Sequence, residues 1–95
     1  MAQRTDAIVL IDVTSGKVNE AAQAITEIHG VREVYSVAGD VDLVAVVSAA
    51  DHDGLTEIIP GGIAKVDGVT RTRTLMAFKT YSGRELDAAY ELGLD

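Results

Sequence analysis

The sequence predicts an α+β domain in which two helices cover one face of a four-stranded antiparallel sheet, in the order β-α-β-β-α-β. One observation is an internal echo. Residues 25–31, Ile-Thr-Glu-Ile-His-Gly-Val, are matched by residues 63–69, Ile-Ala-Lys-Val-Asp-Gly-Val. Each copy is typical of a helix end, a glycine stop and the start of a strand. The other observation is that Val- and Ile-rich runs alternate with stretches of helical apolar spacing. A chain of 95 residues has room for one such domain.

The first strand and helix are predicted from residues 7–29. Residues 7–13 are a nearly unbroken apolar run, which is typical of a strand buried on both faces. Ser15-Gly16 turns the chain, and we expect Ser15 to cap the helix that follows. From residue 17 to 29 apolar residues recur at three- and four-residue spacing, which predicts an amphipathic helix. Gly30 ends this helix because glycine tolerates the left-handed conformation.

The next two strands form a predicted hairpin. Residues 31–38 indicate the second strand and residues 42–48 the third. Gly39-Asp40-Val41-Asp42 connects them, and its glycine can take a positive φ. The third strand is apolar at every position from 43 to 47, as expected for a central strand.

A second helix is expected to begin near Asp51 and to keep its apolar stripe as far as Gly68. Pro60-Gly61-Gly62 lies inside this span and removes a backbone hydrogen bond. We expect a kinked or interrupted helix with the stripe preserved, and division into two short helices is the alternative.

The chain ends in a predicted strand and a predicted helical tail. Residues 69–80 alternate threonine and other side chains in the pattern of a fourth strand. Ser82-Gly83-Arg84-Glu85 is a capping box that opens a short C-terminal helix. We therefore divide the chain into an α+β domain at 1–81 and a helical tail at 82–95.

Composition excludes several classes of function. The chain has no cysteine, which rules out disulfides, zinc–thiolate sites and thiol catalysis. A formal net charge of −7 argues against a protein that binds nucleic acid by itself. We find no signal peptide and no apolar run of membrane-spanning length, so we expect a cytoplasmic protein without membrane contact.

Signals for catalysis, metals and cofactors are weak. His29 and His52 each stand alone, without a partner at metal-binding helical spacing. Asp51-His52-Asp53 has the composition of a metal cluster, but carboxylates are common at any helix N-terminus. We therefore expect no cofactor, no metal and no enzyme activity.

The sheet has more apolar surface than two helices on one face can cover. The first and third strands are apolar on both faces, with Ile8 and Leu10 opposite Val9, and Val44 and Val46 opposite Ala45. Leaving the second face in water would expose a large apolar patch. We expect an obligate homodimer that pairs sheet against sheet.

The hairpin loop Gly39-Asp40-Val41-Asp42 is the leading candidate binding site. A tight loop with glycine presents backbone N–H groups to a carboxylate, and two aspartates can receive an ammonium group. A free α-amino acid carries both groups. The alternative is that glycine and aspartate are simply the residues that hairpins use. Hydroxyls of the Arg71-Thr72-Arg73-Thr74 stretch could also bind ligand, although alternating threonine is ordinary strand sequence.

The strand order, the Gly39–Val44 hairpin and the 68–74 segment Gly-Val-Thr-Arg-Thr-Arg-Thr together resemble the ligand-sensing domain of the Lrp/AsnC family. The resemblance covers roughly residues 5–80 and implies a ferredoxin-like fold in a dimeric α+β barrel, with dimers assembled into rings. It also implies amino-acid effectors bound between dimers near Gly39, Asp40, Val41 and Asp42, with Thr72 and Thr74 as further candidates.

Family members usually carry a helix-turn-helix domain, which we do not find here, so the chain is similar to a stand-alone sensing domain. A full-length Lrp/AsnC-type regulator is the partner that the resemblance implies. The family often has an aromatic residue at the position of Val41.

The sequence is also compatible with two other kinds of domain. Dimeric α+β barrels also include small monooxygenases and isomerases, which need an inward-facing catalytic group. An amino-acid-binding domain of the ACT type has the same strand order. The position of bound ligand and the mode of subunit pairing would distinguish these possibilities.

Overall fold

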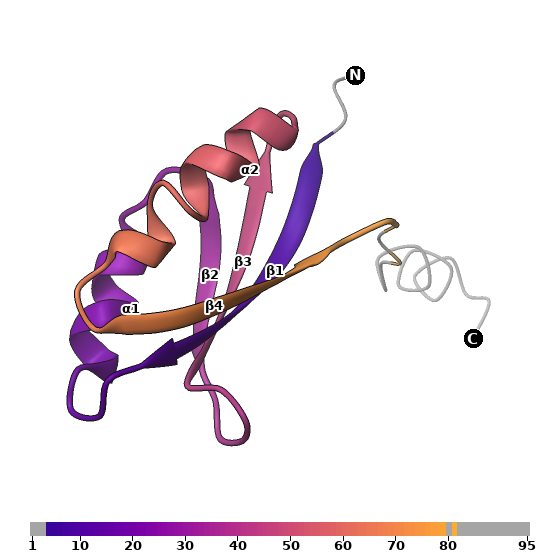
Figure 1. Ribbon diagram of the computed structural model, residues 1–95. Coiled ribbons are helices and arrows are strands. Elements are labelled where there is room, and N and C mark those ends of the chain that lie inside the picture. Colours follow the sequence, from indigo (N-terminus) through magenta and orange to yellow (C-terminus); the bar gives the residue numbers. More distant parts are fainter. Residues whose placement is uncertain (1–3, 80, 82–95) are drawn as a thin grey trace, which may run out of the picture.

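The computed structural model describes residues 4–79 and 81, and it confirms the predicted βαββαβ order (Figure 1). The elements are β1 (Thr5–Val13), α1 (Val18–Thr26), β2 (Val31–Ser36), β3 (Leu43–Ala49), α2 (His52–Ile58), the 3₁₀ helix η1 (Ile63–Lys65) and β4 (Val69–Met76). The strands form one sheet in the order β2-β3-β1-β4, and all neighbouring strands are antiparallel. The predicted helix at 82–95 lies outside the described residues.

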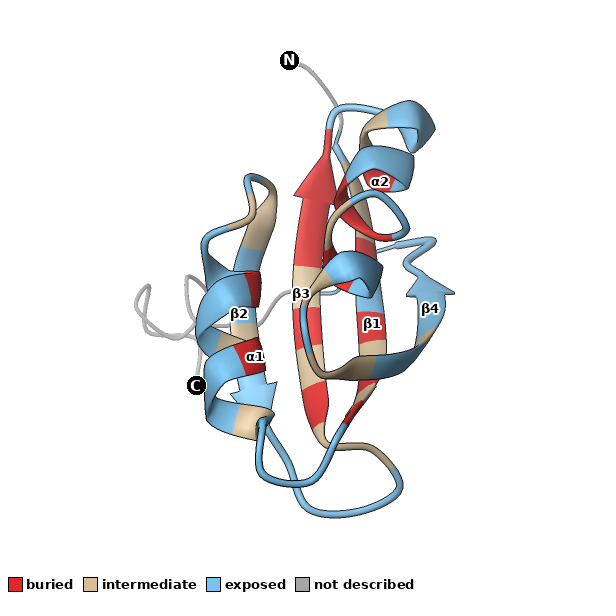
Figure 2. Cartoon of the chain, turned by 60° about the vertical axis from the view of Figure 1, so that its left-hand side comes forward, coloured by how far each residue is buried: buried red, intermediate tan, exposed pale blue. Residues whose placement is uncertain are grey.

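The helices cover one face of this sheet, as predicted (Figure 2). Alternate residues of the two central strands point to the helices and are fully buried, among them Val9, Ala45 and Val47. The helices contribute Ala21 and Ile25 of α1 and Leu55 of α2 to the same core. Burial of this Val, Ile, Leu and Ala cluster is the main favourable term for folding.

The two similar sequence segments, residues 25–31 and 63–69, also have similar structures where each enters a strand. Gly30 has φ +101° and Gly68 has φ +96°, both in the left-handed region. In each copy the strand's first residue donates a backbone hydrogen bond of 3.1 Å to the residue three positions earlier: Val31 to Ile28, and Val69 to Val66. The same glycine stop therefore directs the chain from a helix into β2 and, later, into β4.

The start of α1 differs from expectation, because Ser15 does not cap the helix. The N-cap is Lys17, with no side-chain hydrogen bond to the helix. A turn closed by the 3.0 Å bond from Lys17 N to Thr14 O places Ser15 two residues before the cap. The helix also ends earlier than predicted, at Thr26, where the bond from Glu27 N to Ala24 O tightens the last turn.

The second helical segment is divided into two short helices, which was the alternative interpretation of Pro60-Gly61-Gly62. Proline has no N–H and its ring excludes the carbonyl of the residue four positions earlier, Thr56. That carbonyl accepts instead from Gly61 N at 3.1 Å. A Cβ atom on Gly61 would lie 2.6 Å from Glu57 O, so the chain needs glycine here to turn toward η1.

Two strands are shorter than predicted. β2 ends at Ser36, which pairs with Leu43, the first residue of β3, and β4 ends at Met76, which pairs with Ala7 of β1. The expectation that the first strand is buried on both faces is wrong for one subunit, since the side chain of Ile8 is 39% exposed.

Candidate functional site

The sheet face opposite the helices is uncovered within the described part of the chain, and we call it the open face (Figure 1). Register places apolar side chains of all four strands next to one another there: Ile8 pairs with Val46 on one side and Leu75 on the other, and Tyr35 pairs with Val44. Tyr35 is 48% and Leu75 53% exposed. A contiguous apolar surface of this kind marks an interaction site.

Polar residues lie at both ends of the open face. At one end Asp12 of β1 pairs with Arg71 of β4. At the other end Asp6 pairs with Ser48, and the Oδ1 atom of Asp6 is buried without a hydrogen-bond partner among residues 4–79 and 81. A buried carboxylate oxygen without a donor is costly. A donor supplied from outside the subunit would remove this cost.

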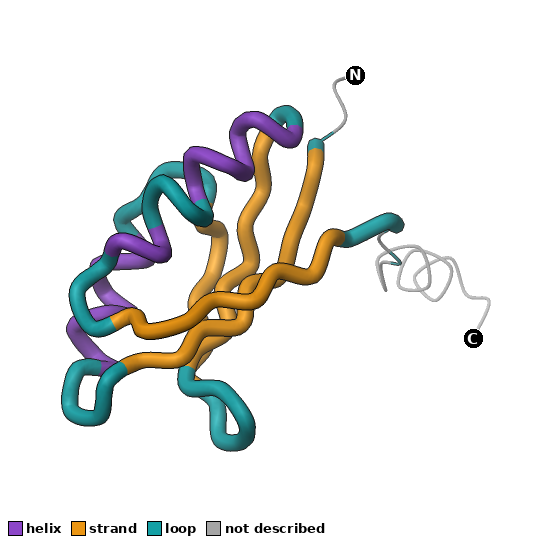
Figure 3. The backbone as a smooth tube through the Cα atoms, viewed as in Figure 1, coloured by secondary structure: helices purple, strands orange, loops and turns teal. Residues whose placement is uncertain are grey.

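The predicted effector loop lies at the end of the molecule where β2 turns into β3 (Figure 3). The bond from Val37 N to Asp42 O, 3.1 Å, closes the hairpin. Asp42 also joins the loop to β1: its N–H donates to Ile11 O at 3.0 Å, and its Oδ2 accepts from Val13 N at 2.8 Å. One carboxylate oxygen of Asp42 is thus engaged in holding the fold together.

The tip of the loop offers hydrogen-bond donors. Within the described residues, the backbone N–H groups from Ala38 to Val41 have no hydrogen-bond partner. Gly39 has φ +144°, and a Cβ atom added to it would meet nothing within 4 Å. Asp40 is exposed and Val41 half-buried. A row of free N–H groups next to an exposed carboxylate can bind the two charged groups of a zwitterion.

The structure of one subunit does not bring Thr72 and Thr74 to this loop. Thr72 pairs with Ile11 and Thr74 with Val9, both on the helix side of the sheet. Since Leu43 pairs with Ile11 from the other side, Thr72 lies two strand spacings, about 9.5 Å, from the start of β3. The loop residues form one group and the threonines another.

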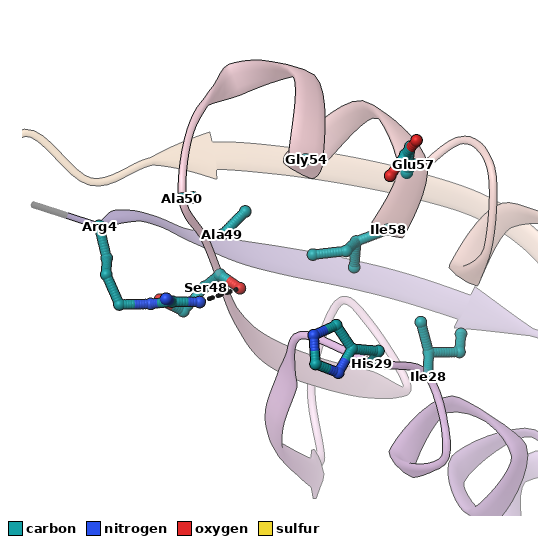
Figure 4. A pocket seen from close by; sticks show the side chains of 9 residues that line it. All are labelled: Arg4, Ile28, His29, Ser48, Ala49, Ala50, Gly54, Glu57 and Ile58. Carbon is teal, nitrogen blue, oxygen red and sulfur yellow. Dashed lines mark hydrogen bonds between the residues drawn. The ribbon is translucent and has the colours of Figure 1, made fainter. Parts of the chain in front are cut away.

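Sequence reasoning missed a hollow at the opposite end of β3 (Figure 4). It has a volume of about 420 Å³ and lies between the start of β1, the turn before β2, the end of β3 and α2. Arg4 donates from Nε to Ser48 Oγ at 2.8 Å and from Nη2 to Ser48 O at 3.3 Å. His29, which stands alone in the sequence without a metal-binding partner, lines the same hollow. No sequence motif marks this hollow, because its lining residues come from three separate segments of the chain, at residues 4, 28–29 and 48–58.

None of the helices found in residues 4–79 has both the length and the apolar character needed to cross a membrane.

This fold with its glycine–aspartate hairpin is similar to the ligand-binding domains of transcription regulators. The family model described as "Lrp/AsnC ligand binding domain" matches residues 6–86. The chain therefore belongs to the Lrp/AsnC family, as its sequence predicted.

The curated relatives are regulators of transcription. The chain is 42% identical over 64 residues to the HTH-type transcriptional regulator LrpA1 of Halobacterium salinarum, a match that covers 67% of this chain and 45% of the relative. It is 39% identical over 61 residues to LrpA of Pyrococcus horikoshii, covering 64% and 43%. In these two matches the chain spans less than half the length of the relative.

Solved structures share the fold. The crystal structure of TTHA0845 from Thermus thermophilus superimposes with a TM-score of 0.78 at 42% identity, covering 82% of this chain and 98% of that one. The AsnC protein of E. coli superimposes with a TM-score of 0.77 at 19% identity, covering 82% and 53%, which shows a common fold.

Proposed function

We propose that this chain is a sensing and assembly domain that binds an amino acid at interfaces between its subunits and thereby regulates transcription. The proposal rests on two features of the described residues: an apolar sheet face that no described segment covers, and a loop whose N–H groups and Asp40 carboxylate have no hydrogen-bond partner among these residues. Membership of the Lrp/AsnC family, with curated relatives that regulate transcription, supports this interpretation over an ACT-type domain or a small barrel enzyme.

The first part of the proposal is a homodimer in which two open faces pack together as an α+β barrel. A two-fold interface uses the same patch on both subunits, so an apolar face can cover itself. The buried Oδ1 of Asp6 supports this arrangement, because it has no hydrogen-bond partner among the described residues and a second copy can supply a donor. Dimers assemble further into rings.

The second part is the effector site at the interface between dimers. The loop N–H groups receive the carboxylate of the amino acid, and Asp40 receives its ammonium group. Gly39 permits the turn, the half-buried Val41 completes the loop, and Asp42 fixes the loop to β1 through Val13 N. Thr72 and Thr74 of an adjacent subunit complete the site, which explains why one subunit leaves them apart from the loop.

Regulation then follows from assembly. An effector that bridges subunits favours the oligomeric state for which it has the higher affinity. The readout is co-assembly with a full-length Lrp/AsnC-type regulator in the cytoplasm, and that regulator supplies the contact with DNA. Within this scheme the chain acts without catalysis and without a cofactor.

The test is native mass spectrometry of the full chain with each of the common amino acids, which reports assembly size and ligand occupancy together. We expect at least one amino acid to bind and to change the distribution of assemblies. Asp40→Ala should abolish this effect, whereas Asp53→Ala, an exposed aspartate in α2, should not. Binding by none of the amino acids, or equal binding by the two variants, would refute the proposed effector site.

A further inference from the structure

The hollow beside Arg4 combines positive charge with an apolar wall. The guanidinium group has five N–H donors, and Ser48 engages two of its nitrogens. The remaining donors of Arg4 have no partner in the part of the chain that the structure describes, so a ligand can accept from them. The side chain of Ser48 is only 4% exposed and its oxygen already accepts from Arg4, so its hydroxyl hydrogen is free to donate in turn.

Basic groups are concentrated around this point. A second hollow of about 450 Å³ adjoins the first and is lined by Arg4, His29 and Arg32. The chain carries 8 lysines and arginines against 15 acids, so a grouping of basic side chains is not the average character of its surface. Guanidinium groups of this kind bind carboxylates through two parallel hydrogen bonds.

The rest of the hollow fits an aliphatic body. Ile28 and Ile58 form its wall on the side away from Arg4, and Ala49 lies nearer to Arg4 than Ile58 does (Figure 4). Among the described residues, Glu57 is the acidic residue of the lining, and it lies in α2 on the opposite side of the hollow from Arg4 (Figure 4). A ligand with a second carboxylate at this end would meet the negative charge of Glu57.

We propose that this hollow is a second ligand site, which binds a small monocarboxylate with a short aliphatic body. The carboxylate pairs with Arg4, assisted by the Ser48 hydroxyl and the His29 ring, and the aliphatic body contacts Ile28 and Ile58. The site is separate from the effector loop, because the two lie at opposite ends of β3, a strand of seven residues that spans about 20 Å.

The experiment is an NMR titration of the ¹⁵N-labelled full chain with 4-methylpentanoate. We expect saturable shifts at the amides of Gly30, Ser48, Ala49 and Gly54, and none at residues 38–42. Two related compounds test whether the hollow selects a single carboxylate. 4-Methylpentan-1-ol lacks the carboxylate and glutarate adds a second one, so both should bind at least about tenfold more weakly.

Substitutions test whether Arg4 and His29 contribute to the binding of 4-methylpentanoate. Arg4→Gln should weaken binding of 4-methylpentanoate at least about tenfold, because it removes the charge-assisted pair. Lys65→Gln changes the net charge equally at an exposed position of η1 and should leave binding unchanged. His29→Ala provides an independent test from another segment and should also weaken binding.

Three results would overturn the proposal. They are the absence of saturable shifts up to the solubility limit of the acid, equal binding of the acid and the alcohol, and shifts confined to residues 38–42. The last result would assign the acid to the effector loop. Failure of the second site leaves the amino-acid titration and Asp40→Ala as separate tests of the proposed function.

Discussion

The backbone N–H of Val13 donates a hydrogen bond of 2.8 Å to the Oδ2 atom of Asp42. This bond joins the end of β1 to a hairpin that follows 29 residues later in the chain. The two aspartates of the loop therefore have different roles. Asp42 holds the loop in place, and Asp40 is exposed and can bind a ligand.

Replacing Asp42 should therefore cost stability, whereas replacing Asp40 should not. Asp42→Ala leaves a part-buried N–H without its acceptor and should lower the free energy of unfolding by about 1–3 kcal/mol. Asp40→Ala should stay within about 0.5 kcal/mol of the wild type. Urea unfolding at neutral pH measures both. Equal effects of the two substitutions would contradict this division.

Gly30 should be among the least replaceable residues. Gly30→Ala places a Cβ atom at φ +101° and against the side chain of Ile58, so we expect a loss of about 2–4 kcal/mol in the free energy of unfolding. Gly16→Ala is the matched control, since φ is +89° but nothing lies within 4 Å of the added atom. It should cost about 1 kcal/mol, the backbone contribution alone. Equal losses of unfolding free energy in the two variants would show that the Ile58 side chain moves away from the added Cβ atom without cost.

The ion pair between Lys17 Nζ and Asp67 Oδ2, 2.8 Å, should be visible in titrations. The hydrogen bond from Lys17 lowers the pKa of Asp67, and the bond to Asp67 raises the pKa of Lys17. The stabilising effect of Asp67 is thus present above its unfolded-state pKa and is lost as pH falls through its lower folded-state pKa. That of Lys17 is present below its unfolded-state pKa and is lost as pH rises through its higher folded-state pKa.

Both side chains of this pair are exposed, so the effect on stability should be small. An NMR titration of the Asp67 carboxyl is the more sensitive measurement. Its pKa should lie below the usual aspartate value in the wild type and return toward that value in Lys17→Gln. An Asp67 titration that Lys17→Gln leaves unaltered would argue against the pair in solution.

A charge on the open face should prevent dimer formation. Leu75 is 53% exposed in one subunit, so Leu75→Glu costs little in the folded monomer but would bury a carboxylate between two sheets. We expect the variant to sediment as a folded monomer. Ala24→Glu on the exposed side of α1 is the control and should keep the wild-type mass. An unchanged mass for Leu75→Glu would exclude this face from the interface.

Local patterns were sufficient to predict much of the fold. The Gly30 and Gly68 stops, the apolar β1 and β3 runs and the capping role of Asp51 follow from side-chain periodicity and glycine conformation; the Asp51 carboxylate accepts from Gly54 N at 2.9 Å. The sequence could not distinguish a kinked helix from two separate helices at Pro60, because both keep the apolar residues on one side. Ser15 was misassigned because the turn before α1 is closed by backbone atoms.

The candidate sites were predictable to different degrees. The hairpin loop was visible because its residues are consecutive. Its bond to Val13 was not, since it depends on the register of β1 against β3. The hollow beside Arg4 could not be predicted, because Arg4, His29 and Ser48 meet only after the sheet and both helices have assembled.

The most direct test of the whole account is sedimentation equilibrium of the unmodified chain across a wide range of concentrations. We expect a mass of two subunits or an even multiple of two, since the open face needs a second copy to cover it. A single-subunit mass at every concentration would contradict the dimer and, with it, a binding site between subunits.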